Sequence, residues 1–281
     1  MIEITYPGSD GCPLYAFLEN TSPEATTGER PPFILLHGGG PDHHSLIPLA
    51  QKLGDCCRIV LPDIRSYGRS VCTDPTRHTW AQYSDDVIAL LDFLGLSRAI
   101  VGSAGLGGTI ALRTAVAHPD RVLASVVISV EDIEDDEKKT AEIAFMDEFA
   151  ARIRAEGIEA AWRPILKDLA PIIGTMVRDA IPRSNPASIA AAAAIGHDRS
   201  FRSIDELAVI ETPTLLIPGM DERHPSALAE QLARVLAKGQ LASVSLSPDL
   251  RTTEDFARAF TPTIRQFVST VVSGLKCTKD G

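Results

Sequence analysis

The residue types best suited to proton transfer gather late in the chain. Asp221, Glu222 and His224 lie close together, and a histidine beside carboxylates can act as a general base or a general acid near neutral pH. The same histidine precedes Pro225, so it can equally be a polar residue at the start of a helix. From the sequence alone both interpretations stay open.

Nucleophilic catalysis requires an alcohol or a thiol together with a base that activates it. Ser103 and Cys72 are the candidate nucleophiles, but neither has an evident base beside it. Asp249 either binds a polar substrate group or belongs to an exposed ion pair, and His43, at the start of a helical pattern, is a candidate for lining a pocket. The acidic run Glu131–Glu137 is interpreted chiefly as a solvated helix start.

Short apolar runs alternate with helical patterns along most of the chain, and these elements must position the candidate residues. Strands are expected at 2–6, 13–19, 33–36, 57–61, 99–102, 124–129, 214–217 and 242–246, and helices at 45–53, 79–94, 106–118, 226–236 and 253–272. Such alternation predicts an α/β fold in which helices cover both faces of a mostly parallel sheet.

Composition excludes several classes of function. The chain has 281 residues and a formal net charge of −10, which argues against a surface for nucleic acid. No apolar run approaches the roughly 20 residues of a membrane span, and the first residues do not resemble a secretory signal. The 5 cysteines lack metal-ligand spacing, and no nucleotide or flavin motif is present. We therefore expect a cytoplasmic protein without metal or cofactor that binds a small molecule; a homodimer is compatible with the sequence.

Four blocks, in order, resemble the α/β-hydrolase superfamily, and within it the proline iminopeptidase-like and enol-lactonase-like members. The blocks are His37–Gly40, Asp63–Ser70, Leu94–Leu112 and Ala117–Val122. The resemblance implies an eight-stranded, mostly parallel sheet. It also implies that Gly38, Gly39 and the backbone N–H of Leu106 form an oxyanion hole that binds a substrate oxygen.

In this family's pattern the third block is the nucleophile elbow, a sharp turn between a strand and a helix. Aligned without gaps, the pattern places Gly105 in the nucleophile position, and glycine has no side chain that could attack a substrate. Counting forward from Leu94 and backward from Pro119 gives the same register. A register shifted by two residues would instead make Ser103 the nucleophile.

The family also places an acid after the seventh strand and a histidine after the eighth. Asp221 and Glu222 match the position of the acid, Glu222 more closely, but residues 247–252 contain no histidine. Two elements of a serine–histidine–acid triad are therefore missing at separate places, which indicates divergence rather than a single substitution. His224, the last histidine in the chain, is the candidate replacement for the base.

Residues 132–207 contain helical patterns interrupted by prolines but no strand-like run. An insertion at this point forms a cap in the superfamily, and a cap over the carboxyl ends of the strands would exclude water from a crevice there. The alternative is that these helices only thicken the core. We expect residues 1–131 and 208–281 to form the core domain and 132–207 to form the cap.

Three functions are compatible with these features. The favoured one is a small-molecule enzyme without a covalent intermediate, of the lyase, cyclase or isomerase type or hydrolysing its substrate with a directly activated water. The second is a catalytically inactive relative that binds a ligand or a partner. The third is an ordinary serine hydrolase that uses Ser103.

Overall fold

The computed structural model describes residues 2–19 and 30–277. Its sheet has 8 strands in the order β1-β2-β4-β3-β5-β6-β7-β8. The strands are β1 (Ile2–Pro7), β2 (Pro13–Leu18), β3 (Pro32–Leu36), β4 (Arg58–Pro62), β5 (Ala99–Ala104), β6 (Val122–Ile128), β7 (Thr214–Ile217) and β8 (Gly239–Leu241). Strand β2 runs antiparallel to both of its neighbours, and the remaining pairs are parallel. The predicted α/β fold with an eight-stranded, mostly parallel sheet is therefore confirmed.

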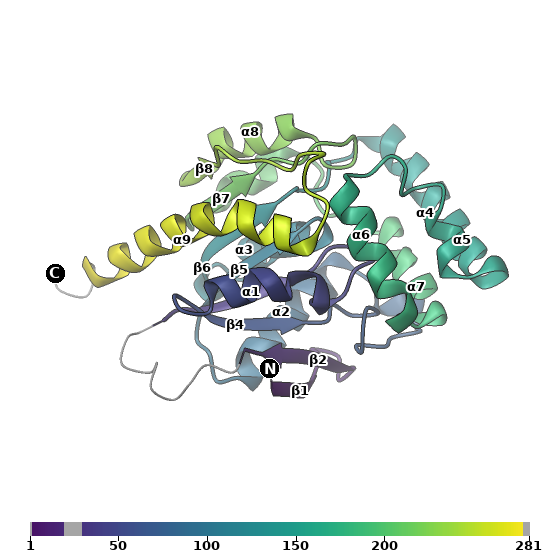
Figure 1. The fold of residues 1–281 in the computed structure, drawn as a ribbon, viewed down its shortest axis with the longest axis horizontal. Coiled ribbons are helices and arrows are strands. Elements are labelled where there is room, and N and C mark those ends of the chain that lie inside the picture. Colours follow the sequence, from purple (N-terminus) through teal and green to yellow (C-terminus); the bar gives the residue numbers. More distant parts are fainter. Residues whose placement is uncertain (1, 20–29, 278–281) are drawn as a thin grey trace.

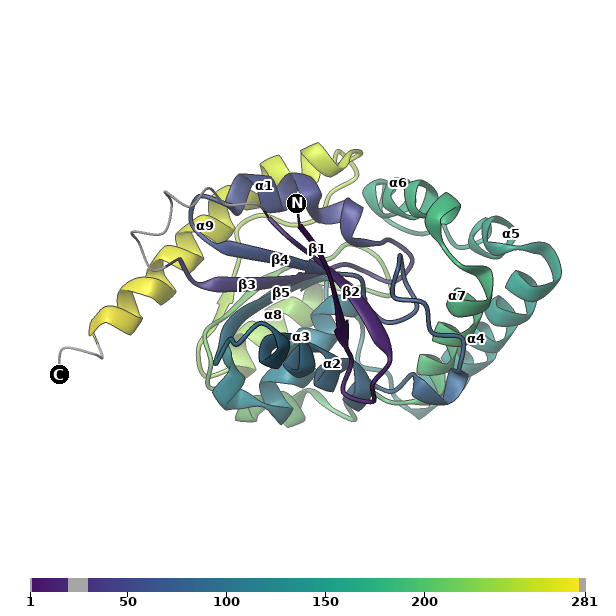
Figure 2. The ribbon, with the colours of Figure 1, turned by 90° about the horizontal axis from the view of Figure 1, so that it is seen from below.

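Helices cover both faces of this sheet (Figures 1 and 2). The helices of the sheet layers are α1 (Ile47–Leu53), α2 (Trp80–Phe93), α3 (Leu106–Ala117), α8 (Ser226–Val235) and α9 (Thr253–Cys277). In Figure 2, α1 and α9 lie on one side of the strands and α2, α3 and α8 on the other.

Alternation along β3 shows how the sequence produces the two layers. Phe33 and Leu35 belong to the apolar cluster that contains the buried residues of α9, whereas Ile34 and Leu36 belong to the cluster of α2 and α3. Successive side chains of a strand point to opposite faces, so a strand that is apolar throughout is buried on both sides. The continuous apolar runs of the sequence are central strands for this reason.

Four α-helices are inserted between β6 and β7, and we call them the inserted helices: α4 (Asp136–Glu156), α5 (Ile158–Trp162), α6 (Pro171–Ala180) and α7 (Pro186–Ala192). Both views place them together at one end of the sheet, away from the two helical layers (Figures 1 and 2). Among the described residues, no helix is both long enough and apolar enough to cross a membrane.

The prediction of a last strand at 242–246 is wrong. Strand β8 is Gly239–Leu241, and the chain after it makes only scattered bonds to the neighbouring segment, from Ala242 N–H to the Leu216 carbonyl and from Leu246 N–H to the Pro218 carbonyl. Ala242 and Leu246 are nevertheless buried, which explains their strand-like pattern. A buried apolar segment without a continuous ladder of hydrogen bonds is not a strand.

Candidate functional site

The turn between β5 and α3 has the geometry of a nucleophile elbow, with Gly105 at its tip. Gly105 has φ 52° and ψ −123°, a backbone conformation that residues other than glycine adopt only with strain. A Cβ placed on Gly105 would lie 3.5 Å from Nε2 of His224 and 3.9 Å from Cα of Gly38. The volume that a nucleophile side chain would occupy is therefore open, and an imidazole nitrogen borders it.

His224 is held by Asp221 within one tight turn after β7. Its Nδ1 lies 2.7 Å from Oδ1 of Asp221, and its backbone N–H donates to the same oxygen at 3.0 Å. With Nδ1 bound to a carboxylate, Nε2 faces Gly105 and is free to accept a proton. We call this pair the Asp221–His224 dyad.

Electrostatics keep the carboxylate of the dyad ionised. Burial alone would raise the pKa of Asp221, but hydrogen bonds from the His224 imidazole and from the backbone N–H groups of Arg223 and His224 lower it below its usual value. An ionised Asp221 stabilises the imidazolium that forms when His224 accepts a proton.

Close packing at Gly219 lets the turn bring His224 to this position. A Cβ at Gly219 would lie 2.2 Å from the carbonyl oxygen of His224 and 2.7 Å from its Cβ. Any side chain there would displace the histidine. Sequence reasoning did not single out Gly219, whose only signal is that it directly follows a buried strand and Pro218.

The loop His37–Gly40, which we call the oxyanion loop, lies beside the elbow. His37 Nε2 accepts a hydrogen bond from the Ile64 N–H at 2.9 Å, and its Nδ1 lies 2.8 Å from the Gly38 carbonyl oxygen. Burial lowers the pKa of His37, so the imidazole stays neutral and serves both bonds. His37 thus holds the loop in place and does not itself line the neighbouring cavity.

Gly38, Gly39 and Leu106 line the same cavity as Gly105. A Cβ at Gly39 would lie 3.7 Å from Cβ of Leu106 and 3.8 Å from the hydroxyl of Tyr67. The oxyanion loop and the first residue of α3 are therefore neighbours, as an oxyanion hole requires.

Of the other predicted site residues, Glu222 lies at the rim of this cavity, and the rest do not line it. Ser103 is fully buried in β5, and its hydroxyl has no hydrogen-bond partner among the described residues. Asp249 is exposed in the loop before α9. Glu222 is exposed at the rim of the cavity. The family pattern favoured Glu222 as the acid, but the carboxylate that contacts the His224 imidazole is that of Asp221. Ser103 and Asp249 are therefore not part of the cavity that Gly105 lines.

His43 is also withdrawn from the cavity. It is buried, stacks on Phe17 with ring centroids 3.6 Å apart, and places Nδ1 2.8 Å from Oδ1 of Asp63. His43 is therefore a structural residue beneath the oxyanion loop.

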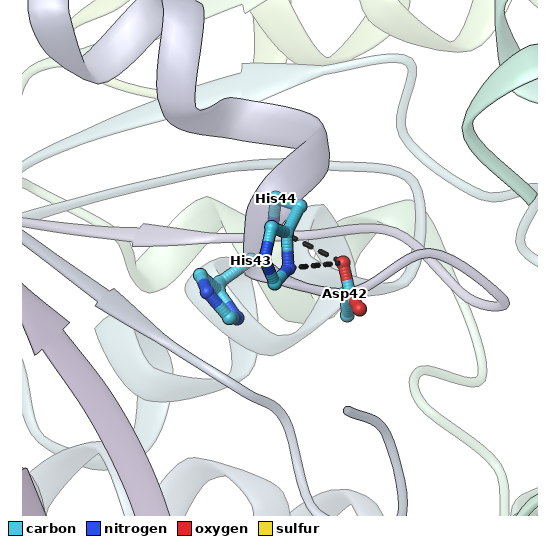
Figure 3. Close-up of side chains that lie close together, drawn as sticks. All are labelled: Asp42, His43 and His44. Carbon is cyan, nitrogen blue, oxygen red and sulfur yellow. Dashed lines mark hydrogen bonds and ion pairs between the residues drawn. The ribbon is translucent and has the colours of Figure 1, made fainter. Parts of the chain in front are cut away.

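Asp42, His43 and His44 are the cluster with metal-ligand spacing among the residues described (Figure 3). Both oxygens of Asp42 already accept hydrogen bonds from Arg183, Oδ2 from Nε at 2.7 Å and Oδ1 from Nη2 at 3.1 Å. A cation bound there would lie against a guanidinium, so these residues do not fit a metal site.

The cavity above Gly105 has a volume of about 1190 Å³ and lies between the elbow and the inserted helices. Its apolar lining includes Phe145, Phe149, Trp162, Ile165, Met176 and Ile195. Glu131 also lines it with a half-buried side chain, so the interpretation of this residue as part of a solvated helix start is wrong. Helix α4 begins only at Asp136, which leaves Glu131 in the loop that follows β6.

Comparison with known proteins agrees with this geometry. Residues 33–259 match the model of the alpha/beta hydrolase family. The chain belongs to this family. Among solved structures, a thermophilic esterase from Thermogutta terrifontis superimposes with a TM-score of 0.77 and 24% identity, covering 96% of this chain and 99% of the esterase. The enol-lactonase from Burkholderia xenovorans LB400 gives 0.76 and 23%, covering 94% and 99%. Because both structures are less than 25% identical to this chain, they establish its fold and not its reaction.

Two curated relatives are more similar over shorter stretches. The chain is 40% identical over 101 residues to the putative carbamate hydrolase RutD of Caulobacter sp. strain K31, which is 36% of this chain and 38% of the relative. It is 32% identical over 114 residues to the 2-heptyl-3-hydroxy-4-quinolone dioxygenase AqdC1 of Rhodococcus erythropolis, 40% of each chain. The matched stretch thus spans about two-fifths of the length of these relatives of the alpha/beta hydrolase family.

Proposed function

We propose that this alpha/beta hydrolase family member is a small-molecule enzyme that works by non-covalent general-base catalysis. The observation that carries the proposal is the 3.5 Å between Nε2 of His224 and the position of a Cβ on Gly105. A base that faces an empty nucleophile position has no alcohol to activate. It is placed to take a proton from whatever occupies that volume, a substrate group or a water molecule.

In this mechanism the substrate binds with its carbonyl oxygen toward the oxyanion loop and the N–H of Leu106. His224 accepts a proton at Nε2, and Asp221 stabilises the resulting imidazolium. In an enolisation, the electron pair of the broken C–H bond forms a C=C bond and the carbonyl π pair moves onto the oxygen. In a hydrolysis, the deprotonated water oxygen forms a bond to the carbonyl carbon and the carbonyl π pair moves onto the oxygen, which gives a tetrahedral oxyanion. Backbone N–H groups stabilise either charge, and His224 then gives its proton to the enolate or, as the tetrahedral oxyanion collapses, to the leaving group.

The names of the relatives cover more than one class of reaction. Their names include a putative carbamate hydrolase and a dioxygenase. The family therefore accommodates both hydrolytic and non-hydrolytic reactions, and the proposal requires only a substrate or water proton within reach of His224. The inserted helices act as the cap that limits the access of bulk water to this step.

The test is a turnover screen on small esters, lactones and β-diketones, combined with intact-mass measurement. We expect turnover without any covalent adduct, and a loss of about 10²–10⁴-fold in kcat for His224→Ala. His197→Ala, which removes an exposed histidine paired with Asp147, is the matched control and should retain full activity.

Three outcomes would contradict the proposal. An adduct on Ser103, detected with a fluorophosphonate probe, would establish the serine-hydrolase alternative. Unchanged turnover in His224→Ala would remove the base from the mechanism. Ligand binding without turnover across the screen would establish the inactive, ligand-binding alternative.

A further inference from the structure

The charged side chains from the start of α4 that line the cavity neutralise one another. Lys138 Nζ lies 2.6 Å from Oδ2 of Asp132, and Lys139 Nζ lies 3.4 Å from Oε2 of Glu134. All four residues line the cavity. These ammonium groups are already paired, so they do not offer a free positive charge to a ligand.

The guanidinium next to the dyad is also paired. Arg223 Nη2 lies 2.6 Å from Oε2 of Glu142, and the guanidinium stacks on the ring of Phe145 at 4.5 Å. Burial raises the pKa of Glu142 and Arg223 lowers it, with a net rise, which indicates an environment that disfavours additional negative charge. Arg202, the remaining basic side chain of the lining, is exposed.

Glu131 differs from these carboxylates because no cation in the described part of the chain lies within ion-pair distance of it. Its Oε2 accepts a hydrogen bond from the Thr109 hydroxyl at 3.0 Å. The side chain is half-buried and lines the cavity. Its charge adds to burial in raising the pKa of the Tyr67 hydroxyl, which also lines the cavity. A carboxylate that lies partly out of water with a single hydroxyl partner favours a positively charged neighbour.

Glu131 is also close to the reacting position. Thr109 lies in the first turn of α3, where its N–H donates to the Gly105 carbonyl at 3.4 Å. On the other side, the N–H of Asp132 donates to the carbonyl of Arg223 at 2.8 Å. Glu131 thus lies between the elbow and the loop that carries the dyad.

From these contacts we infer that the cavity takes an apolar ligand that carries a cationic nitrogen, such as an ammonium group, and that Glu131 pairs with that nitrogen. The aromatic and aliphatic lining binds the apolar body of the ligand. A carboxylate ligand is rejected, because it would lie beside Glu131 while the cavity lining, in the part of the chain that the structure describes, offers no buried unpaired Lys or Arg to compensate it. This inference rests on the proposed function, because it names the class of ligand that would bind in the cavity where the proposed reaction takes place.

The test measures binding rather than turnover, so that its failure can be distinguished from failure of the proposed mechanism. Isothermal titration calorimetry at pH 7.5 compares three probes with one phenylpropyl body: 3-phenylpropylamine as the ammonium, 3-phenylpropanol as the neutral form and 3-phenylpropionate as the carboxylate. His224→Ala is titrated in parallel, because a binding preference does not require the base. We expect the ammonium to bind at least about tenfold more tightly than the carboxylate in both proteins.

Glu131→Gln removes the charge while keeping the hydrogen-bonding shape. In this variant we expect the ammonium to lose about tenfold in affinity, the carboxylate to gain affinity and the alcohol to stay unchanged. Glu137→Gln is the matched control, because it makes the same change of net charge at an exposed residue outside the cavity lining. Thermal melts verify that both variants fold.

The inference is overturned if the carboxylate binds as tightly as the ammonium in the unmodified chain. It is also overturned if Glu131→Gln keeps the preference, if Glu137→Gln loses it equally, or if none of the three probes binds.

Discussion

At the scale of single residues, the candidate site is defined by a glycine at the tip of the elbow and by the imidazole that faces it. Gly105 keeps the backbone of the elbow, and His224 directs Nε2 toward it. The imidazole comes from the loop after β7 rather than from the loop before α9. A base can therefore reach the elbow from a second direction, provided that the carboxylate which orients it is nearby.

Gly105→Ser should create a reactive serine. Its Cβ would lie 3.5 Å from Nε2 of His224, which brings the hydroxyl within hydrogen-bond reach of the base. We expect a fluorophosphonate probe to label Gly105→Ser and to leave the unmodified chain unlabelled. Because φ at this position is 52°, the substitution should also cost about 1–3 kcal/mol of unfolding free energy, measured by urea titration.

Gly105→Ala is the control for this variant, since it introduces the same backbone strain without a hydroxyl and should not be labelled. Labelling of Gly105→Ser should disappear when His224→Ala is added. A folded Gly105→Ser protein that resists the probe would show that His224 does not reach the elbow.

Sequence reasoning singled out Gly105, Asp221 and His224, but not the close approach of the His224 imidazole to Gly105. Asp221 and His224 are three residues apart, so their proximity could be read from the chain. The orientation of Nε2 depends on the close packing at Gly219, and the exposure of Glu131 to the cavity depends on where α4 begins. The packing at Gly219 is tertiary and is not encoded in local patterns, whereas the start of α4 is set locally by Asp135, whose side chain accepts a hydrogen bond from the Lys138 N–H.

At the scale of elements, the inserted helices pack directly against the oxyanion loop. A Cβ at Gly40, which has φ 97°, would lie 2.6 Å from Cζ2 of Trp162 in α5 and 3.0 Å from Cγ2 of Val177 in α6. Two residues further on, Asp42 is bound by Arg183, which follows α6. The position of these helices and the geometry of the proposed oxyanion hole are therefore linked.

Arg183→Gln should destabilise the chain through this link. Burial would raise the pKa of Asp42, but the hydrogen bonds and charge of Arg183 lower it, so the carboxylate stays charged in a buried place. Without the guanidinium, we expect a loss of about 1–3 kcal/mol in unfolding free energy, measured by urea titration.

Arg152→Gln serves as the matched control for Arg183→Gln. Arg152 pairs with the exposed Glu148 on the surface of α4, and such pairs contribute less than about 1 kcal/mol. Equal losses in the two variants would show that the bond to Asp42 has no special role.

The sequence pattern predicted the central strands of the sheet better than the elements at its edge. The central strands were readable because continuous apolar runs report burial on both faces. The last strand was misplaced because Ala242 and Leu246 are buried but make only scattered backbone hydrogen bonds rather than a continuous ladder. Helix α9 ends at Cys277, beyond the predicted end at 272.

At the scale of the whole molecule, buried polar networks tie distant parts of the chain together. The Arg65 guanidinium binds Asp86 in α2 and Asp10 in the turn between β1 and β2, with distances of 2.8–2.9 Å. Near it, His78 contacts the hydroxyl of Tyr83 at 2.8 Å and that of Ser66 at 3.1 Å. Burial, and then the charge of Arg65, lower the pKa of His78 to about 4.

The stability of the chain should therefore fall between about pH 6.5 and pH 4. In this window the unfolded chain binds a proton at His78 more readily than the folded chain does, so acidification favours unfolding. We expect this histidine to contribute a loss on the order of 3 kcal/mol, measured as unfolding free energy against pH. The pKa of His37 is also lowered by burial and adds to the loss in the same direction.

His78→Gln should flatten this dependence on pH, and His197→Gln, at an exposed histidine, should not. The same slope in His78→Gln and the unmodified chain would show that His78 is not the titrating group.

The turn Asp221–His224 also makes the proposed catalytic machinery modular. Its base and its orienting carboxylate are neighbours in sequence and share one short loop, joined by the isolated bridge between these two residues. Under the proposed mechanism, the segment before α9 has no catalytic role. Because Gly219 packs against His224 within the same short segment, the pair and the glycine that positions it could be transferred to a related fold together, as residues 219–224.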